Sequence, residues 1–226
     1  MQRGINFVLK ILKWPLAILM VALFVPILNA DTHLIRHTLS QNLFLYFVAP
    51  MMAMIGVWFV IPGLNGSHLA IFEHEFTHML AALMTFHKPA ALDVQSDKGG
   101  SFSYYGEGNW LITLAPYFIP TFPLFLMIVS LGWTLTGHQL PELFIPVLGF
   151  MFGYHLVSNA TQIHSEQTDF PKAGWIFSVL FLPTANLFTF GIVWAFAVGG
   201  WRYIDKYFEL IGKYILLLLE KVEIII

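Results

Sequence analysis

The fold of this chain is organised around the stretch IFEHEFTHML, which runs from Ile71 to Leu80. It contains the pattern His-Glu-x-x-His, formed by His74, Glu75 and His78. Residues four apart lie on one face of an α-helix, so both imidazoles can reach a single metal ion. Glu75 lies about 100° round the helix from His74, which suits a carboxylate that polarises a water rather than binding the ion. The apolar run over residues 68–86 is long enough to cross a bilayer, so the sequence predicts a metal site inside a membrane helix.

The composition indicates an integral membrane protein. Of the 226 residues, 58% are hydrophobic and 11% are charged, and the mean hydropathy is +0.72. Soluble domains carry about 25% charged residues. The net charge is −2 and the chain has no dense basic block, so no nucleic acid is expected as a partner. Because the chain has no cysteine, any metal has to be held by His, Asp, Glu or water.

Six apolar segments of about 20 residues each predict an all-α fold with about six transmembrane helices. They cover residues 14–30, 42–62, 68–86, 110–133, 140–161 and 174–200. In the fourth segment, Pro116, Pro120 and Pro123 predict a kinked or broken helix. We therefore expect a polytopic membrane domain over residues 1–200. An amphipathic C-terminal helix is expected over residues 201–226, where charged and apolar residues alternate.

The distribution of basic residues predicts the orientation. Three of them lie in the N-terminal segment and four in the tail after Gly200, so the positive-inside rule places both termini in the cytoplasm. Residues 31–41 are then a short polar connection, in which His33, Arg36 and His37 are interfacial loop residues. With two spans before it, the motif helix would then run outward. Two alternatives stay open: residues 14–30 do not span the membrane, or the N-terminus lies outside. We expect a multi-pass protein of a bacterial inner membrane.

The longest polar stretch, residues 87–109, follows the motif helix and has strand character from Ser101 to Tyr105. Two interpretations stay open: a short β-hairpin that dips into the membrane, or an ordinary interfacial loop with an aromatic belt. In the first case an exposed strand can hold an extended substrate by β-addition. The candidate substrate-positioning residues there are Ser101, Phe102 and Ser103.

A catalytic zinc site takes three protein ligands and leaves one position for water, so a third ligand must come from another part of the chain. The candidates near or beyond the end of the fifth apolar segment are Asp169, His164, His155 and Glu166. Asp169 is preferred, because a carboxylate is compact and needs no matched tautomer, and because Phe170-Pro171 fixes the backbone after it. His164 and His155 are the next alternatives. Asn159 is a candidate for stabilising an oxyanion or orienting substrate.

The order of these features resembles the site-2 protease (M50) family of intramembrane zinc metallopeptidases. The shared features are His74-Glu75-x-x-His78 in a membrane helix, a loop with strand character, a proline-rich span and a late Asp. The resemblance implies that His74, His78 and Asp169 bind Zn²⁺ and that Glu75 is the catalytic base. It also implies that the loop is a membrane-dipping hairpin and that the substrate is a membrane protein or peptide in the lipid bilayer.

Together these observations predict a zinc-dependent endopeptidase that cleaves peptide bonds within or beside the membrane. Two other functions stay open. One is a non-proteolytic membrane protein that keeps zinc for structure or regulation. The other is a transporter in which the His/Glu cluster carries metal ions or protons.

Overall fold

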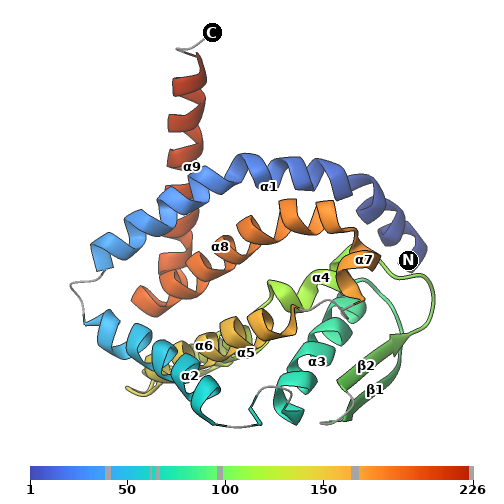
Figure 1. The fold of residues 1–226 in the computed structure, drawn as a ribbon. Helices are drawn as coiled ribbons and strands as arrows, with labels where there is room; N and C mark the ends of the chain where they lie inside the picture. The colour runs from blue at the N-terminus through green and yellow to red at the C-terminus, as the bar shows by residue number, and fades with distance from the viewer. Residues whose placement is uncertain (39–41, 62, 65–66, 96–98, 164–167, 224–226) are drawn as a thin grey trace.

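The computed structural model describes residues 1–38, 42–61, 63–64, 67–95, 99–163 and 168–223, most of which are helical (Figure 1). The elements are, in order, α1 (Gln2–Thr38), the π-helix η1 (Phe44–Val48), α2 (Ala49–Val60), α3 (His68–Met84), β1 (Pro89–Gln95), β2 (Gly99–Tyr104), α4 (Trp110–Leu114), the 3-10 helix η2 (Ala115–Tyr117), α5 (Thr121–Leu135), α6 (Phe144–Gln162), α7 (Asp169–Ala173), α8 (Trp175–Gly199) and α9 (Trp201–Glu223). The prediction of a mainly helical protein with a small hairpin is confirmed.

Two helices of the described chain, α1 and α8, are long and apolar enough to cross a membrane. The pair formed by α4–η2 and α5 passes the same test together, but it is bent by 86° at its break. Pro116 lies in η2 and Pro120 immediately precedes α5, so the predicted proline break is present. The predicted count of about six transmembrane helices is not confirmed, because the other helices of the described residues do not meet the same length and apolarity.

α1 continues through the segment that the sequence predicted as a polar connection, so that prediction is wrong for residues 31–38. Asp31 is buried, and its Oδ1 accepts a hydrogen bond of 2.7 Å from the Tyr207 hydroxyl of α9. The buried Thr38 hydroxyl accepts one of 3.0 Å from the Trp194 indole N–H of α8. Because these partners satisfy the polar side chains, the helix does not have to end at Asp31. It therefore carries the three residues expected in a loop, His33, Arg36 and His37.

The first turns of α1 lie beside the segment that follows the C-terminal end of α3 (Figure 1). The Gln2 side-chain N–H donates to the Tyr105 carbonyl at 3.0 Å, and the Asn6 amide nitrogen lies 3.4 Å from His87 Nε2. α3 therefore runs toward the end at which α1 begins. This direction is opposite to the one obtained by counting spans from a cytoplasmic N-terminus. α2 packs mainly against α6.

The motif helix α3 begins where the sequence predicted. Ser67 caps it, because the Ser67 hydroxyl accepts a hydrogen bond of 3.3 Å from the Ala70 N–H. After α3, the strands β1 and β2 pair antiparallel, with Leu92 opposite Phe102. The predicted hairpin is therefore present, whereas its position in the membrane stays a prediction. Both strands lie against α3 (Figure 1).

α2 and α6 approach closely because α6 carries two glycines four residues apart. A methyl group at Gly149 would collide with the Phe47 carbonyl, and one at Gly153 with the Met51 carbonyl. Small residues at this spacing let two helix backbones come together, which is a common device where lipid leaves little hydrophobic drive for helix association. α6 is thereby fixed against the helix that leads into α3.

Replacing Gly153 by Ala is predicted to lower the free energy of unfolding by about 1–3 kcal/mol, because backbone atoms of α2 cannot move aside as a flexible side chain can. Gly56→Ala is the matched control. Gly56 lies on the exposed face of α2 with no atom near its missing methyl group, so the change is expected to be neutral or stabilising by up to about 1 kcal/mol. Unfolding of both variants in detergent measures the difference, and equal stabilities would contradict the close packing.

Candidate metal centre

α3 gathers its polar residues on the side that faces the protein interior. His74 and His78 are 6% and 8% exposed, and Thr77 between them is also buried. The Thr77 hydroxyl donates to the Glu73 carbonyl one turn earlier at 2.7 Å, which satisfies it within the helix. The two imidazoles approach each other, and their Nε2 atoms lie 3.2 Å apart.

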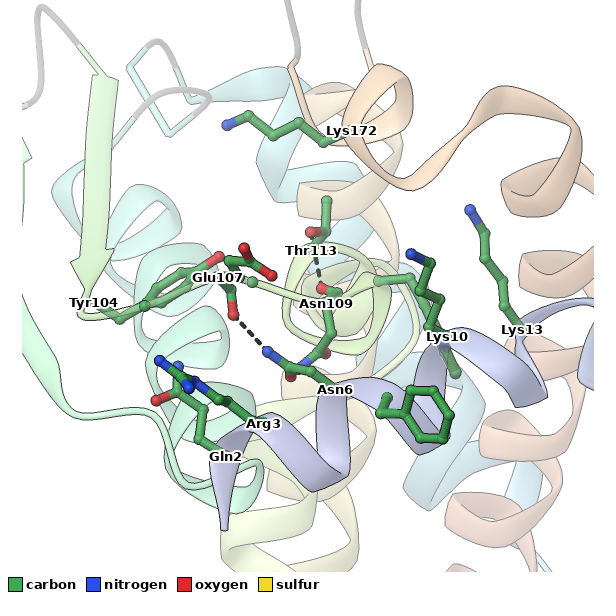
Figure 2. A pocket seen from close by; sticks show the side chains of 14 residues that line it. Gln2, Arg3, Asn6, Lys10, Lys13, Tyr104, Glu107, Asn109, Thr113 and Lys172 are labelled. Carbon is green, nitrogen blue, oxygen red and sulfur yellow. Dashed lines mark hydrogen bonds between the residues drawn. The ribbon is translucent and has the colours of Figure 1, made fainter.

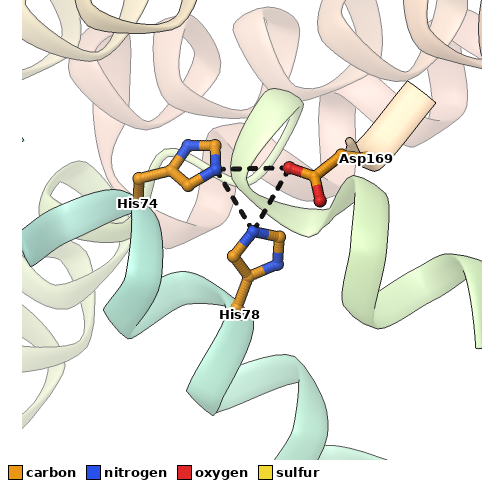
Figure 3. A group of neighbouring side chains, drawn as sticks. All are labelled: His74, His78 and Asp169. Atoms are coloured by element: carbon orange, nitrogen blue, oxygen red, sulfur yellow. Dashed lines mark hydrogen bonds and ion pairs between the residues drawn. The ribbon is translucent and has the colours of Figure 1, made fainter. Parts of the chain in front are cut away.

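The third group of the centre is Asp169, the first residue of α7. Its Oδ2 lies 3.5 Å from His74 Nε2 and 3.5 Å from His78 Nε2 (Figure 3). Aromatic packing holds α7 in this place, because the Phe170 ring lies 4.7 Å from the Tyr117 ring and stacks on Trp175 at 5.0 Å. The sequence separates Asp169 from the motif by about ninety residues, and the fold brings the three side chains together.

The spacing of the three ligand atoms fits one tetrahedral metal ion. Nitrogen and oxygen ligands at about 2.0–2.2 Å from such an ion stand about 3.3–3.6 Å apart, and the three separations here are 3.2, 3.5 and 3.5 Å. The hydrogen bond that His78 makes also suits metal binding, which needs the lone pair of one ring nitrogen. Its Nδ1 lies 2.7 Å from the Ile112 carbonyl, which can only accept a hydrogen bond, so Nδ1 carries the proton and the Nε2 lone pair faces the centre.

Tyr117 also contacts Asp169, and it was not among the candidate site residues predicted from the sequence. Its hydroxyl donates to Asp169 Oδ2 at 3.0 Å, and its ring packs edge-on against His74 at 5.3 Å. Tyr117 lies in η2, so the proline break of the fourth apolar segment places it. Carboxylates that bind metals usually accept such an outer hydrogen bond, which fixes their orientation. The signal in the sequence was a tyrosine directly after the first proline of that break.

Glu75 lies on the side of α3 that faces the hairpin. Its carboxylate lies beside the backbone of Phe102 in β2 and near His78 and Asp169. Gly100 allows this approach, since a methyl group there would collide with the side chains of Ile71 and Glu75. Glu75 therefore stands next to the three-residue group without belonging to it, as the motif geometry predicts for a base.

The strand β2 presents alternating faces to α3 and to the outside. Phe102 and Tyr104 pack against a small core that includes Ala82 and Ile112, whereas the side chains of Ser101 and Ser103 are exposed. Burial raises the pKa of the Tyr104 phenol above its ordinary value, and the negative charge of Asp169 raises it further. Of the candidate positioning residues, only Phe102 thus directs its side chain toward α3.

The alternative third ligands are placed differently. His155 is buried, but its Nδ1 faces Glu73 Oε1 at 3.8 Å and its Nε2 lies 3.0 Å from the Asn159 amide nitrogen. Among the described residues the group that can share an ion contains His74, His78 and Asp169 and does not include His155. The Asn159 side chain lies beside His155, and its role toward an oxyanion or substrate stays a prediction. His164 lies outside the described residues, as does Glu166.

Comparison with known proteins agrees with this geometry. The fold and the site define a membrane-associated protein with a His-His-Asp centre, which is the kind of centre that a metallopeptidase uses. Residues 47–213 match the model of the Peptidase M50B-like family, and the chain therefore belongs to this family of metallopeptidases. The resemblance to the site-2 protease (M50) family is confirmed. The search of curated proteins gave no match. The search of solved structures gave none either.

The centre predicts a contrast between two variants. Asp169→Ala removes one of three metal-binding atoms and should lower metal affinity by more than the 10–100-fold typical of losing an outer hydrogen-bond partner. His155→Ala removes a buried histidine that belongs to no three-ligand group, and it should keep one metal ion per chain. Metal content after dialysis, measured by mass spectrometry of the purified protein, distinguishes them. If only His155→Ala loses metal, the third ligand is His155.

Proposed function

We propose that this protein is a zinc-dependent endopeptidase that cleaves membrane-embedded or membrane-adjacent substrates within the membrane. The observation that carries the proposal is the triangle of His74, His78 and Asp169 with Glu75 beside it. Membership of the M50B-like family supports the same reaction. Two imidazoles and one carboxylate form a donor set typical of catalytic zinc, since three protein ligands leave one position for water.

In the proposed reaction, metal binding and proton transfer are carried out by different residues. His74, His78 and Asp169 hold the ion, and Tyr117 fixes the Asp169 carboxylate through its hydrogen bond of 3.0 Å. When bound, Zn²⁺ supplies a Lewis acid that polarises the scissile carbonyl and lowers the pKa of a water toward about 7. Glu75 accepts the proton of the attacking water and later donates it to the leaving amine.

The substrate is a membrane protein or peptide whose scissile segment has unwound, because helical hydrogen bonds hide the carbonyls of an intact helix. β2 offers a place to hold it. In the described two-stranded sheet, β2 keeps one edge that does not pair with β1. We infer that the Phe102 N–H lies on this edge, beside Glu75, where an extended peptide can add along Ser101, Phe102 and Ser103 by backbone hydrogen bonds.

The same proposal includes the domain organisation, the partners and the location of the protein. In this proposal the multi-pass metallopeptidase domain covers residues 1–200, and α9 (Trp201–Glu223) is the amphipathic helix that follows it. The partners are the lipid bilayer and the substrate, with no nucleic acid. The bacterial inner membrane is the proposed location. If the basic N-terminal end of α1 lies in the cytoplasm, the C-terminal end of α3 lies on that side too, because the two ends are neighbours.

Glu75→Gln is predicted to keep the zinc and lose cleavage, because the amide cannot accept the water's proton. The loss should be about 10²–10⁴-fold. Glu142→Gln, the same change at an exposed loop residue, is the control. The measurement compares new N-termini of membrane proteins in cells that express each variant. Identical sets of termini for wild type and Glu75→Gln would refute proteolysis, and zinc- or proton-dependent flux in liposomes would then indicate a transporter.

Phe102→Pro tests the proposed substrate strand. Proline removes the outward N–H and is tolerated where a strand edge donates no ladder bond. The control is Phe102→Ala, which loses the same side chain but keeps the N–H. Cleavage by the proline variant is expected to be at least about tenfold slower than by the alanine variant, as for loss of one well-placed hydrogen bond, with equal zinc content in both. Equal rates would show that this edge of β2 does not contribute.

A further inference from the structure

A cavity of about 950 Å³ opens between the first turns of α1, the segment that joins β2 to α4, and α7. Its lining includes Arg3, Lys10 and Lys13 of α1 and Lys172 of α7 (Figure 2). Nothing in the proposed peptidase mechanism uses these residues. The cavity therefore raises the question of which ligand its four cations would accept.

The walls of the cavity are held together by hydrogen bonds. The Asn6 amide donates to the Glu107 carbonyl at 2.6 Å, and the Asn109 amide donates to Asn6 Oδ1 at 2.8 Å. The Trp110 indole N–H donates to the Leu9 carbonyl at 2.9 Å. These contacts join α1 to the loop before α4 across about one hundred positions of sequence. The cavity is thus a preformed site, which lowers the entropy lost when a ligand binds.

The charges in the cavity are strongly unbalanced. Four of the chain's eleven lysines and arginines line it, against one carboxylate, that of Glu107. In the described part of the chain the ion pairs within 4.0 Å all involve histidines, so none of these cations has a carboxylate partner there. Lys13 lies over the Phe177 ring at 5.1 Å, which leaves its charge available. Like charges gathered without counter-ions attract an anion.

The surface beside the cavity is apolar. Phe7 lines the cavity and is 65% exposed, and Ile11 and Trp14 on α1 are 56% and 50% exposed. These residues continue into the segment of α1 that is apolar enough to cross a membrane. A ligand that fits both surfaces carries a negative group and a long apolar part. Basic residues directly outside a membrane helix are also the usual binding site for anionic lipid headgroups.

We propose that this cavity binds the phosphate group of an anionic phospholipid, whose acyl chains lie along the exposed apolar face of α1. Lys10, Lys13 and Lys172 bind the phosphate, and Arg3 adds positive charge at the rim. Lys172 lies three residues after Asp169 on α7. A lipid bound to Lys172 would therefore keep α7, which carries Asp169 of the candidate metal centre, at the depth of the lipid headgroups. The proposal depends neither on zinc nor on proteolysis.

The test is the thermal stability of the full-length protein in a neutral detergent, titrated with dihexanoyl-phosphatidylglycerol or with dihexanoyl-phosphatidylcholine. A ligand that binds the folded state raises Tm, and at a given concentration a tighter ligand raises it more. Phosphatidylglycerol is expected to raise Tm and phosphatidylcholine is not. Replacing Lys10, Lys13 and Lys172 together by Gln should weaken the apparent affinity about a hundredfold, since each basic residue near an anionic lipid contributes about fivefold.

The control variant replaces Lys206, Lys213 and Lys221 of α9 by Gln. It has the same net charge, but its exposed lysines lie on a helix that contacts the other end of α1, through Asp31 and His33. It should bind phosphatidylglycerol as wild type does. If the cavity variant with three Gln residues fails to fold, Lys172→Gln alone should still lose about fivefold in affinity, and replacing the three cavity lysines by Arg should retain binding.

Four results would overturn the proposal. The two lipids could raise Tm equally, or the cavity and α9 variants could lose affinity equally, which would indicate unspecific attraction. Inorganic phosphate could give the same shift at the same concentration, which would identify a free anion as the ligand. A hexaglutamate peptide could displace the lipid at lower concentration, which would identify an acidic protein segment as the ligand.

Discussion

The structure depends on placing one carboxylate against two imidazoles in an apolar interior. An ionised Asp in such surroundings is unstable unless hydrogen bonds or a cation compensate for the water it has lost. Asp169 is only 9% exposed, and its Oδ2 faces His74, His78 and the Tyr117 hydroxyl. We propose that a metal ion supplies the positive charge that compensates for this buried carboxylate.

Much of the fold provides the elements that meet at Asp169. The break between α4 and α5 turns η2 toward α3, which brings the Tyr117 hydroxyl to the carboxylate and the Ile112 carbonyl to His78. An unbroken helix over residues 110–135 would direct these groups elsewhere. Prolines are tolerated in such a position because neighbouring groups satisfy the freed backbone atoms. The proline-rich segment therefore belongs to the architecture of the centre.

The sequence predicted the parts of this arrangement that local chemistry determines. His74, Glu75 and His78 define a motif by spacing alone, Ser67 is a cap by type, and the hairpin follows from strand character between turn residues. Asp169 was selected by its ligand chemistry, and the structure brings it to the two histidines. That the three hold zinc stays a prediction, as does the catalytic role of Glu75.

The differences between the predictions and the structure have one physical cause. Whether a polar residue can be buried depends on partners that lie far away in the sequence. Asp31 was expected in a loop because it follows an apolar run, but Tyr207 lies 176 positions later and satisfies it inside a helix. Tyr117 escaped notice because its only significance is its distance from Asp169. The direction of α3 relative to α1 could not be decided from the sequence, because counting spans requires knowing which apolar segments cross the membrane.

X-ray absorption at the zinc edge of the zinc-loaded, detergent-purified protein tests the central claim most directly. The centre described above predicts four-coordinate zinc with two imidazole nitrogens at about 2.0–2.1 Å and oxygen ligands at about 2.0–2.2 Å. Asp169→Ala should alter the oxygen shell and leave both imidazoles in place. A spectrum with three or more imidazoles, or with six oxygen ligands and no imidazole, would contradict a centre built from His74, His78 and Asp169.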